Sequence, residues 1–178
     1  MLNKLISVSG AILLVLFLFG CQEQSVTDPV AENSNELNLN KGVIESATGS
    51  GHIEFDGGLR VFTHNARNKA NGSSGHFDLN RHDTGIHFGG SVICLNVEGN
   101  VAYFAGEIET SNSEDPNWDP GSFVVWSTID NGEGNNALTD EISLVYGGYT
   151  EAQQVISLCE SGFVVAYTEI SQGNIQIR

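Results

Sequence analysis

Hydrophobic and polar residues alternate along most of the chain after Lys41, in short runs that glycine and asparagine separate. Alternation with a period of two is typical of β-strands that bury one face. The runs with this pattern are 51–55, 59–67, 75–79, 86–97, 101–110, 122–130, 141–146, 162–170 and 174–177. Their spacing predicts an all-β fold, an antiparallel barrel or sandwich of about eight or nine strands.

Local features refine this pattern. The run 122–130 is apolar on both faces, as in a strand that is buried on both sides. The pairs Asp56-Gly57 and Gly99-Asn100 stand between strand-like runs and favour tight two-residue turns, because these residues adopt positive φ angles. The one helix that the pattern suggests covers 150–158. The sequence therefore predicts antiparallel hairpins and one short helix.

The first twenty residues differ from the rest of the chain. Lys4 precedes an apolar run of about 15 residues, which is shorter than the roughly 20 that cross a bilayer. An export signal is therefore favoured over a retained transmembrane helix. The sequence Leu-Phe-Gly-Cys at 18–21 resembles the bacterial lipobox. This resemblance implies cleavage before Cys21 and acylation of Cys21.

Gln22 follows the cysteine at a position where an aspartate would resemble the inner-membrane retention signal. The resemblance therefore implies export with lipid anchoring in the outer membrane or at the cell surface, and the periplasmic face is the other location. Residues 22–41 contain no aromatic residue and no apolar periodicity, which predicts a flexible tether. We expect three parts: a signal peptide over 1–20, the lipidated cysteine and tether over 21–41, and a single all-β domain over 42–178.

Charge narrows the possible partners. The chain has 22 acidic and 7 basic residues, a formal net charge of −15. Nucleic-acid binding needs basic residues that gather on one face, so this class of partner is excluded.

Besides Cys21 the chain has Cys94 and Cys159. An even number of cysteines in an exported chain favours one disulfide between them, and two unrelated buried thiols are the alternative.

An acidic, glycine-rich loop at 130–141 offers a candidate metal site. Asp130, Glu133 and Asp140 would supply carboxylate oxygens to calcium, which takes six to eight oxygen ligands. The spacing does not match an EF-hand, and a solvated hairpin loop is the alternative. A second acidic loop contains Trp118, a candidate for exposed stacking on a sugar.

Other residues suggest chemistry more weakly. All five histidines fall within 36 residues, yet no His-x-His pair occurs, so a zinc or copper site is the weaker interpretation. Glu107 and Glu109 would share one face of a strand, a spacing that suits glycoside hydrolysis, although such pairs arise by chance in so acidic a chain. No Gly-x-Ser-x-Gly motif is present.

Four segments, 57–67, 90–102, 130–134 and 173–177, follow one another in an order that resembles small secreted β domains of bacterial cell-surface proteins. The resemblance covers roughly 48–178 and implies the fold without implying an activity. Such domains usually carry an aromatic residue where this chain has His64. We expect His64 to be a buried, hydrogen-bonded histidine, and a local specialisation is the alternative.

These observations predict a non-catalytic binding or interaction module that a lipid anchor holds near a membrane. Its expected partners are the membrane, through the anchor, and a protein or glycan ligand. A calcium-binding or carbohydrate-binding domain is the first alternative, and a small hydrolase is the second. Calcium is the one cofactor that the sequence suggests.

Overall fold

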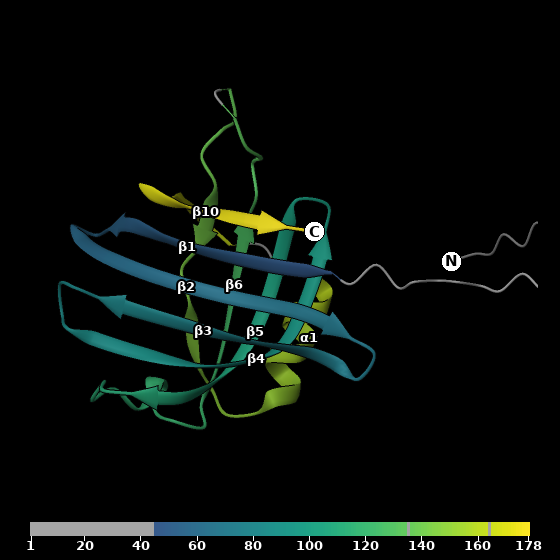
Figure 1. The fold of residues 1–178 in the computed structure, drawn as a ribbon. Coiled ribbons are helices and arrows are strands. Elements are labelled where there is room, and N and C mark those ends of the chain that lie inside the picture. The colour runs from purple at the N-terminus through teal and green to yellow at the C-terminus, as the bar shows by residue number, and fades with distance from the viewer. Residues whose placement is uncertain (1–44, 135, 164) are drawn as a thin grey trace, which may run out of the picture. The chain divides into compact units, whose positions relative to one another are not determined.

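A computed structural model describes residues 45–134, 136–163 and 165–178, and in these ranges it contains ten strands, one α-helix and one 3₁₀ turn (Figure 1). The predicted signal peptide, Cys21 and the whole predicted tether lie outside the described residues. In chain order the elements are β1 (Ser46–Phe55), β2 (Gly58–Lys69), β3 (Gly72–Arg81), β4 (Ile86–Glu98), β5 (Val101–Ser111), η1 (Pro116–Trp118), β6 (Phe123–Ile129), β7 (Glu141–Ser143), β8 (Tyr146–Tyr149), α1 (Ala152–Ser161), β9 (Tyr167–Glu169) and β10 (Gln172–Ile177).

All strands belong to one antiparallel sheet with the order β10-β1-β2-β3-β4-β5-β6-β7-β9, and β8 pairs with β6. The sheet curls into a half-barrel, so that β10 and β1 to β3 cross over β5 and β6 (Figure 1). The predicted all-β, antiparallel fold is confirmed. β8 was not among the predicted strands, and the run predicted over 162–170 forms a strand only at Tyr167–Glu169.

The predicted hairpins form with one difference in turn geometry. Asp56 and Gly57 join β1 to β2 with φ angles of 53° and 74°, so both residues of this turn are left-handed. Between β4 and β5 only Gly99 has a positive φ, at 66°. The expectation of two positive φ angles was wrong at Gly99-Asn100, because one type of tight hairpin turn requires a positive φ only at its first residue.

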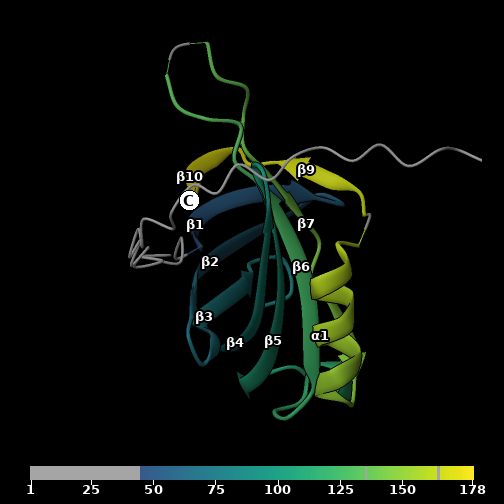
Figure 2. The ribbon, with the colours of Figure 1, turned by 90° about the vertical axis from the view of Figure 1, so that its right-hand side faces the viewer.

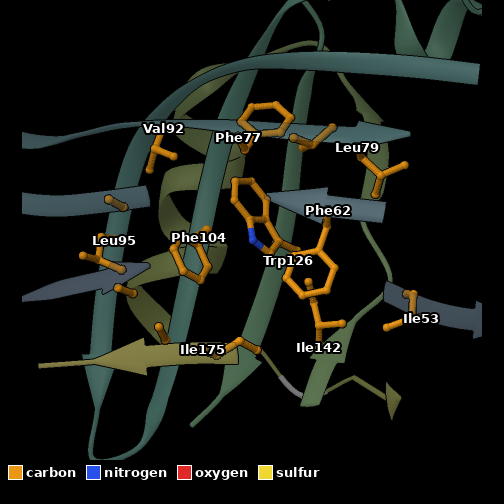
Figure 3. Packing of buried hydrophobic residues seen from close by; sticks show 14 of the residues in the cluster. Ile53, Phe62, Phe77, Leu79, Val92, Leu95, Phe104, Trp126, Ile142 and Ile175 are labelled. Carbon is orange, nitrogen blue, oxygen red and sulfur yellow. The ribbon is translucent and has the colours of Figure 1, made fainter. Parts of the chain in front are cut away.

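Aromatic side chains fill the inside of the half-barrel (Figure 3). Trp126 on β6 stacks on Phe104 with ring centroids 4.8 Å apart, and it packs on Phe77 at 4.9 Å. The gap that remains beside Trp126, Phe62 and His64 measures about 10 Å³, which is at most the space of one water molecule. The inside of the half-barrel is therefore a packed core.

Two glycines of β1 make room for rings of the next strand. Gly49 lies opposite His64 and Gly51 lies opposite Phe62 in the pairing of β1 with β2. A Cβ atom at Gly49 would stand 2.9 Å from Cε1 of His64, and one at Gly51 would stand 3.0 Å from the ring of Phe62. Both positions therefore require glycine for close packing.

Helix α1 covers the outer side of β4, β5 and β6 (Figure 2). Val155 on the helix packs with Val125 of β6 and Ala105 of β5, so β6 is buried on both faces as predicted. The side chain of Asn96 on β4 donates hydrogen bonds to the carbonyl groups of Cys159 and Glu160, which lie in the last turn of the helix. Within the described ranges, no helix is long and apolar enough to cross a bilayer.

Candidate functional site

The outer side of β10, β1, β2 and β3 carries polar side chains in three rows that run across the strands. The central row consists of Gln176, Thr48, Asn65 and His76. The rows on either side are formed by Asn174, Ser50, Thr63 and Asp78, and by Arg178, Ser46, Arg67 and Ser74. We call these twelve residues the polar face.

Strand alternation places the polar face outside. Ala47, Phe62, Ala66, Phe77 and Ile175 occupy the intervening positions and are buried in the core. Because successive side chains of a strand point to opposite faces, their polar neighbours point outward. Eight of the twelve are exposed and the other four are half-buried, so α1 leaves this part of the sheet uncovered.

Two adjoining depressions lie on the polar face. One measures about 330 Å³ and is lined by Ser46, Thr48, Asn65, Ala66, Arg67, Gln176 and Arg178. The other measures about 340 Å³ and is lined by Thr48, Gly49, Ser50, His64, Asn174 and Gln176. Thr48 and Gln176 belong to both, so the two depressions form one shallow, polar surface. Neither is lined by an aspartate or a glutamate.

Hydrogen bonds orient several side chains of this surface. Gln176 donates from Nε2 to Oε1 of Glu133 at 2.7 Å, and Arg178 donates from Nη2 to Oε1 of Gln176 at 3.3 Å. On the opposite border, Nε2 of His87 lies 2.6 Å from Oδ2 of Asp78. The amide of Asn65 and the guanidinium of Arg67 form no side-chain hydrogen bond within the described residues, so both are available to a ligand.

The three carboxylates of the proposed calcium loop have another role in the structure. Asp130 accepts hydrogen bonds from the backbone N–H groups of Gly132 and Ile177, and Asp140 accepts them from those of Asn131 and Ile175. Ile175 and Ile177 belong to β10, the edge strand of the sheet. The two aspartates therefore bind backbone donors on the edge that a further strand would otherwise pair with.

Glu133 binds Gln176 instead of joining the aspartates. Among the described residues, no group of three or more His, Cys, Asp or Glu side chains is arranged to hold a metal ion. The calcium interpretation of Asp130, Glu133 and Asp140 therefore receives no support, because backbone donors occupy the oxygens that a cation would need. The zinc or copper interpretation of the histidines also receives no support, because among the described residues they form no group that is arranged to hold a metal ion.

His64 is buried, as predicted, but it is not hydrogen-bonded as predicted. Its side chain packs against Phe62, with ring centroids 5.8 Å apart, and against Phe104 at 4.8 Å. Neither ring nitrogen has a hydrogen-bond partner in the described part of the chain. Burial lowers the pKa of His64 to about 3, so the imidazole is neutral at ordinary pH.

Trp118 occupies another place than expected, whereas Glu107 and Glu109 share one face of β5 as predicted. Trp118 stacks on Phe88 with centroids 4.7 Å apart and is partly buried, so it is not the exposed sugar platform that the sequence suggested. Glu107 and Glu109 point outward from β5. Neither lines the two depressions of the polar face.

Cys94 on β4 and Cys159 on α1 form a disulfide, with Cα atoms 6.4 Å apart. Cys159 is completely buried and Cys94 nearly so. The bond links residues that are 65 positions apart and holds α1 against the sheet. Of the two alternatives for these cysteines, the structure contains the disulfide.

Sequence reasoning did not identify the polar face. Its signal was present as polar residues at every second position, in Ser46, Thr48 and Ser50 and again in Thr63, Asn65 and Arg67. What the sequence does not show is that β10, at the other end of the chain, lies beside β1 and completes the rows.

No family model matches the chain, and neither a curated protein nor a solved structure shows a significant match to it.

Proposed function

We propose that the protein is an exported, lipid-anchored binding module whose polar face binds an acidic glycan. The observation that carries this proposal is the row arrangement of the polar face, with two adjoining depressions on the part of the sheet that α1 leaves uncovered. Export and anchoring rest on the apolar leader and on Cys21, which lie outside the described residues. The packed core has no room for a sugar ring, which leaves the outer surface as the place for a glycan.

The chemistry of the side chains favours a glycan. Hydroxyl and amide groups donate and accept hydrogen bonds, as sugar hydroxyls do. Neighbouring rows lie about 7 Å apart and neighbouring strands about 4.8 Å apart, so an extended polymer meets a new polar side chain at each step. A single hydrogen bond contributes only about 1 kcal/mol net, which means that binding depends on several acting together.

The charge of the polar face favours an acidic glycan. Among the twelve residues Arg67 and Arg178 contribute +2 and Asp78 contributes −1, and Glu133, which accepts a hydrogen bond from Gln176, adds −1 at the border. With histidine neutral this surface is therefore formally neutral, in a chain whose net charge is −15. Arginine binds carboxylates through two parallel hydrogen bonds. At 0.15 M salt, charges more than about 8 Å away are largely screened, so the local guanidinium of Arg67, which forms no side-chain hydrogen bond among the described residues, outweighs the net charge of the chain.

The same lining favours binding over hydrolysis. Glycoside hydrolysis uses two carboxyl groups on either side of the scissile bond. The two depressions are lined by hydroxyl, amide, guanidinium and imidazole groups and by two small apolar residues, without a carboxylate pair. We therefore propose a non-catalytic module.

The anchor is tested by metabolic labelling with a palmitate analogue. We expect label on the wild-type chain and none on the variant Cys21→Ala, because the lipobox cysteine is the only acylation site that the leader provides. Immunoblotting shows that the variant is still made. Label that persists on Cys21→Ala would end the proposal of lipidation at this residue.

Glycan binding is tested with the acylated full chain in detergent, by equilibrium titration at 0.15 M salt. Polygalacturonate represents acidic glycans and dextran represents neutral ones. We expect stronger binding of polygalacturonate, and at least a severalfold loss of affinity in Arg67→Gln and in Asn65→Ala. The exposed amide Gln153 on α1 supplies the matched control Gln153→Ala, which should bind normally. Equal affinity of all three variants would remove the polar face from the proposal.

A further inference from the structure

Two arginines point into the half-barrel at one end of its concave side. Arg60 on β2 and Arg81 on β3 are direct partners across the two strands. They stand two positions from Phe62 and Leu79, which are buried in the core, so strand alternation gives all four side chains the same inward direction. The polar face lies on the opposite side of these strands.

The two guanidinium groups share a small cavity with apolar walls. The cavity measures about 40 Å³ and is lined by Arg60, Arg81, Leu79, Ile86, Phe88, Trp118 and Val145. The stacking of Trp118 on Phe88, at an interplanar angle of 26°, fixes one wall. The lining residues of the cavity thus come from β2, β3, β4, η1 and the link between β7 and β8, and they surround two positive charges.

The charges in this cavity are only partly balanced. The Nε atoms of Arg60 and Arg81 are both buried, and neither has a hydrogen-bond partner within the described residues. Nη2 of Arg81 lies 3.3 Å from Oδ2 of Asp83, and Cζ of Arg60 lies 4.8 Å above the ring of Phe55. Burial and the charge of Arg81 lower the pKa of Arg60, while Asp83 and Asp56 act in the opposite direction. Two N–H donors therefore remain to be satisfied by an acceptor.

We propose that this cavity binds the carboxylate group of a small organic acid whose short apolar tail rests on Trp118 and Val145. The volume of about 40 Å³ is roughly three times the 10–15 Å³ of cavity space that holds one water molecule, so the cavity has room for a carboxylate group, and it is too small for a sugar ring. The planar fork of a guanidinium matches a planar carboxylate, and the apolar walls strengthen the charge-assisted hydrogen bonds.

This inference does not depend on the proposed function. The two arginines of the cavity lie on the concave side of β2 and β3, whereas the glycan proposal rests on the outer side of the same strands. Failure of one proposal therefore leaves the other standing. Separate variants, Arg60→Gln for the cavity and Arg67→Gln for the polar face, distinguish the two results.

The test is an NMR titration of the acylated full chain in detergent, in which the side-chain Nε–Hε signals of arginine are followed. Butyrate is the probe, butyramide is the neutral analogue of the same shape, and sulfate is the tetrahedral anion. We expect saturable shifts of the Arg60 and Arg81 signals with butyrate, much smaller shifts with sulfate, and none with butyramide. The wild-type protein is enough for this test. The proposal is overturned if the Arg60 and Arg81 signals do not move with butyrate, or if they move equally with butyramide.

Variants then assign the site. Arg60→Gln and Arg81→Gln should each raise the Kd for butyrate about tenfold or more, because each removes a charge-assisted hydrogen bond. The matched control is Lys69→Gln, which removes one positive charge from an exposed position at the far end of β2. If Lys69→Gln weakens butyrate as much as Arg60→Gln does, the effect is one of general charge and the proposal fails.

Discussion

The outer faces of the two halves of the curled sheet differ in their side chains and in whether α1 covers them. Where α1 covers β4, β5 and β6, the outward positions are mainly apolar, as at Cys94, Ala105 and Val125. Over β10, β1, β2 and β3 the outward positions carry hydroxyl, amide and charged groups, and α1 leaves them uncovered. Most inward positions of both halves belong to one core rich in aromatic residues, and Arg60 and Arg81 are exceptions at one end.

This difference suggests that the covered half of the sheet serves mainly stability and that the uncovered half serves ligand binding. The covered half is buried on both sides, so its residues contribute mainly to the free energy of unfolding. The uncovered half buries only its inner side, which leaves the composition of its outer side free to serve a ligand. We therefore expect substitutions in the core and in the covered half to change stability, and substitutions on the polar face to change binding alone.

The largest effect is expected from Trp126→Ala. Trp126 lies at the centre of the core and stacks on Phe104, so its removal leaves a cavity. We expect the free energy of unfolding to fall by about 3–5 kcal/mol, measured by urea denaturation. Asn65→Ala on the polar face is the control and should change it by less than about 0.5 kcal/mol. A loss of similar size at Asn65 would contradict the separation.

Removal of the disulfide tests the covered half. The double variant Cys94→Ala, Cys159→Ala frees a loop of 65 residues, and we expect a loss of about 4 kcal/mol in the free energy of unfolding. Chemical denaturation of the wild type with and without reductant gives an independent value. Affinity of the folded variant for polygalacturonate should stay the same, because α1 lies on the other half of the sheet. A parallel loss of affinity would show that the two halves are coupled.

The pH dependence of stability tests the shared core at His64. The unfolded chain binds a proton at this residue near pH 6.5, whereas the folded protein does so only near pH 3. The unfolded state therefore binds more protons between these values, and the contribution of His64 to stability falls as the pH drops through this window. From pH 7 to pH 5 we expect a loss of about 2 kcal/mol from His64 alone.

The variant His64→Phe lacks the titrating group and keeps an aromatic ring in the core. Its loss of stability between pH 7 and pH 5 should be smaller than that of the wild type by the same amount. Identical pH profiles of the two proteins, measured by urea denaturation, would contradict the burial of a neutral imidazole.

A smaller effect is expected at the edge of the uncovered half. Asp140→Asn removes one of the acceptors that hold β10 and the loop before β7, and it should lower the free energy of unfolding by about 1–3 kcal/mol. Glu133→Gln is the control, because this exposed side chain has a single side-chain partner.

Addition of 1 mM calcium should leave the Tm of the wild type unchanged, and a rise of several degrees would support the calcium interpretation.

The sequence was informative where a pattern is local. Alternation located nine of the ten strands, and the turns at Asp56 and Gly99 followed from their residue types. The strand β8 was missed because its middle is Gly147-Gly148, which gives no alternation signal. The run predicted over 162–170 forms a strand only at Tyr167–Glu169, and α1 covers Ala152–Ser161 where 150–158 was predicted.

The sequence was misleading where distant segments meet. The sequence presents Asp130 and Asp140 as cation ligands and does not show that both accept hydrogen bonds from backbone N–H groups of β10. The sequence suggests that Trp118 is exposed, whereas in the structure it stacks on Phe88 of β4. The polar face depends on the pairing of β1 with β10, which are more than 100 residues apart, and no local pattern reports that pairing.

The central claim, that the uncovered half of the sheet is the binding surface, is tested most directly by mapping backbone amide shifts during an NMR titration with a galacturonate oligosaccharide. We expect saturable shifts that gather at Thr48, Asn65 and Gln176 and that leave the amides of α1 unchanged. Shifts that gather on α1, or no shift at any concentration of the oligosaccharide, would contradict the claim.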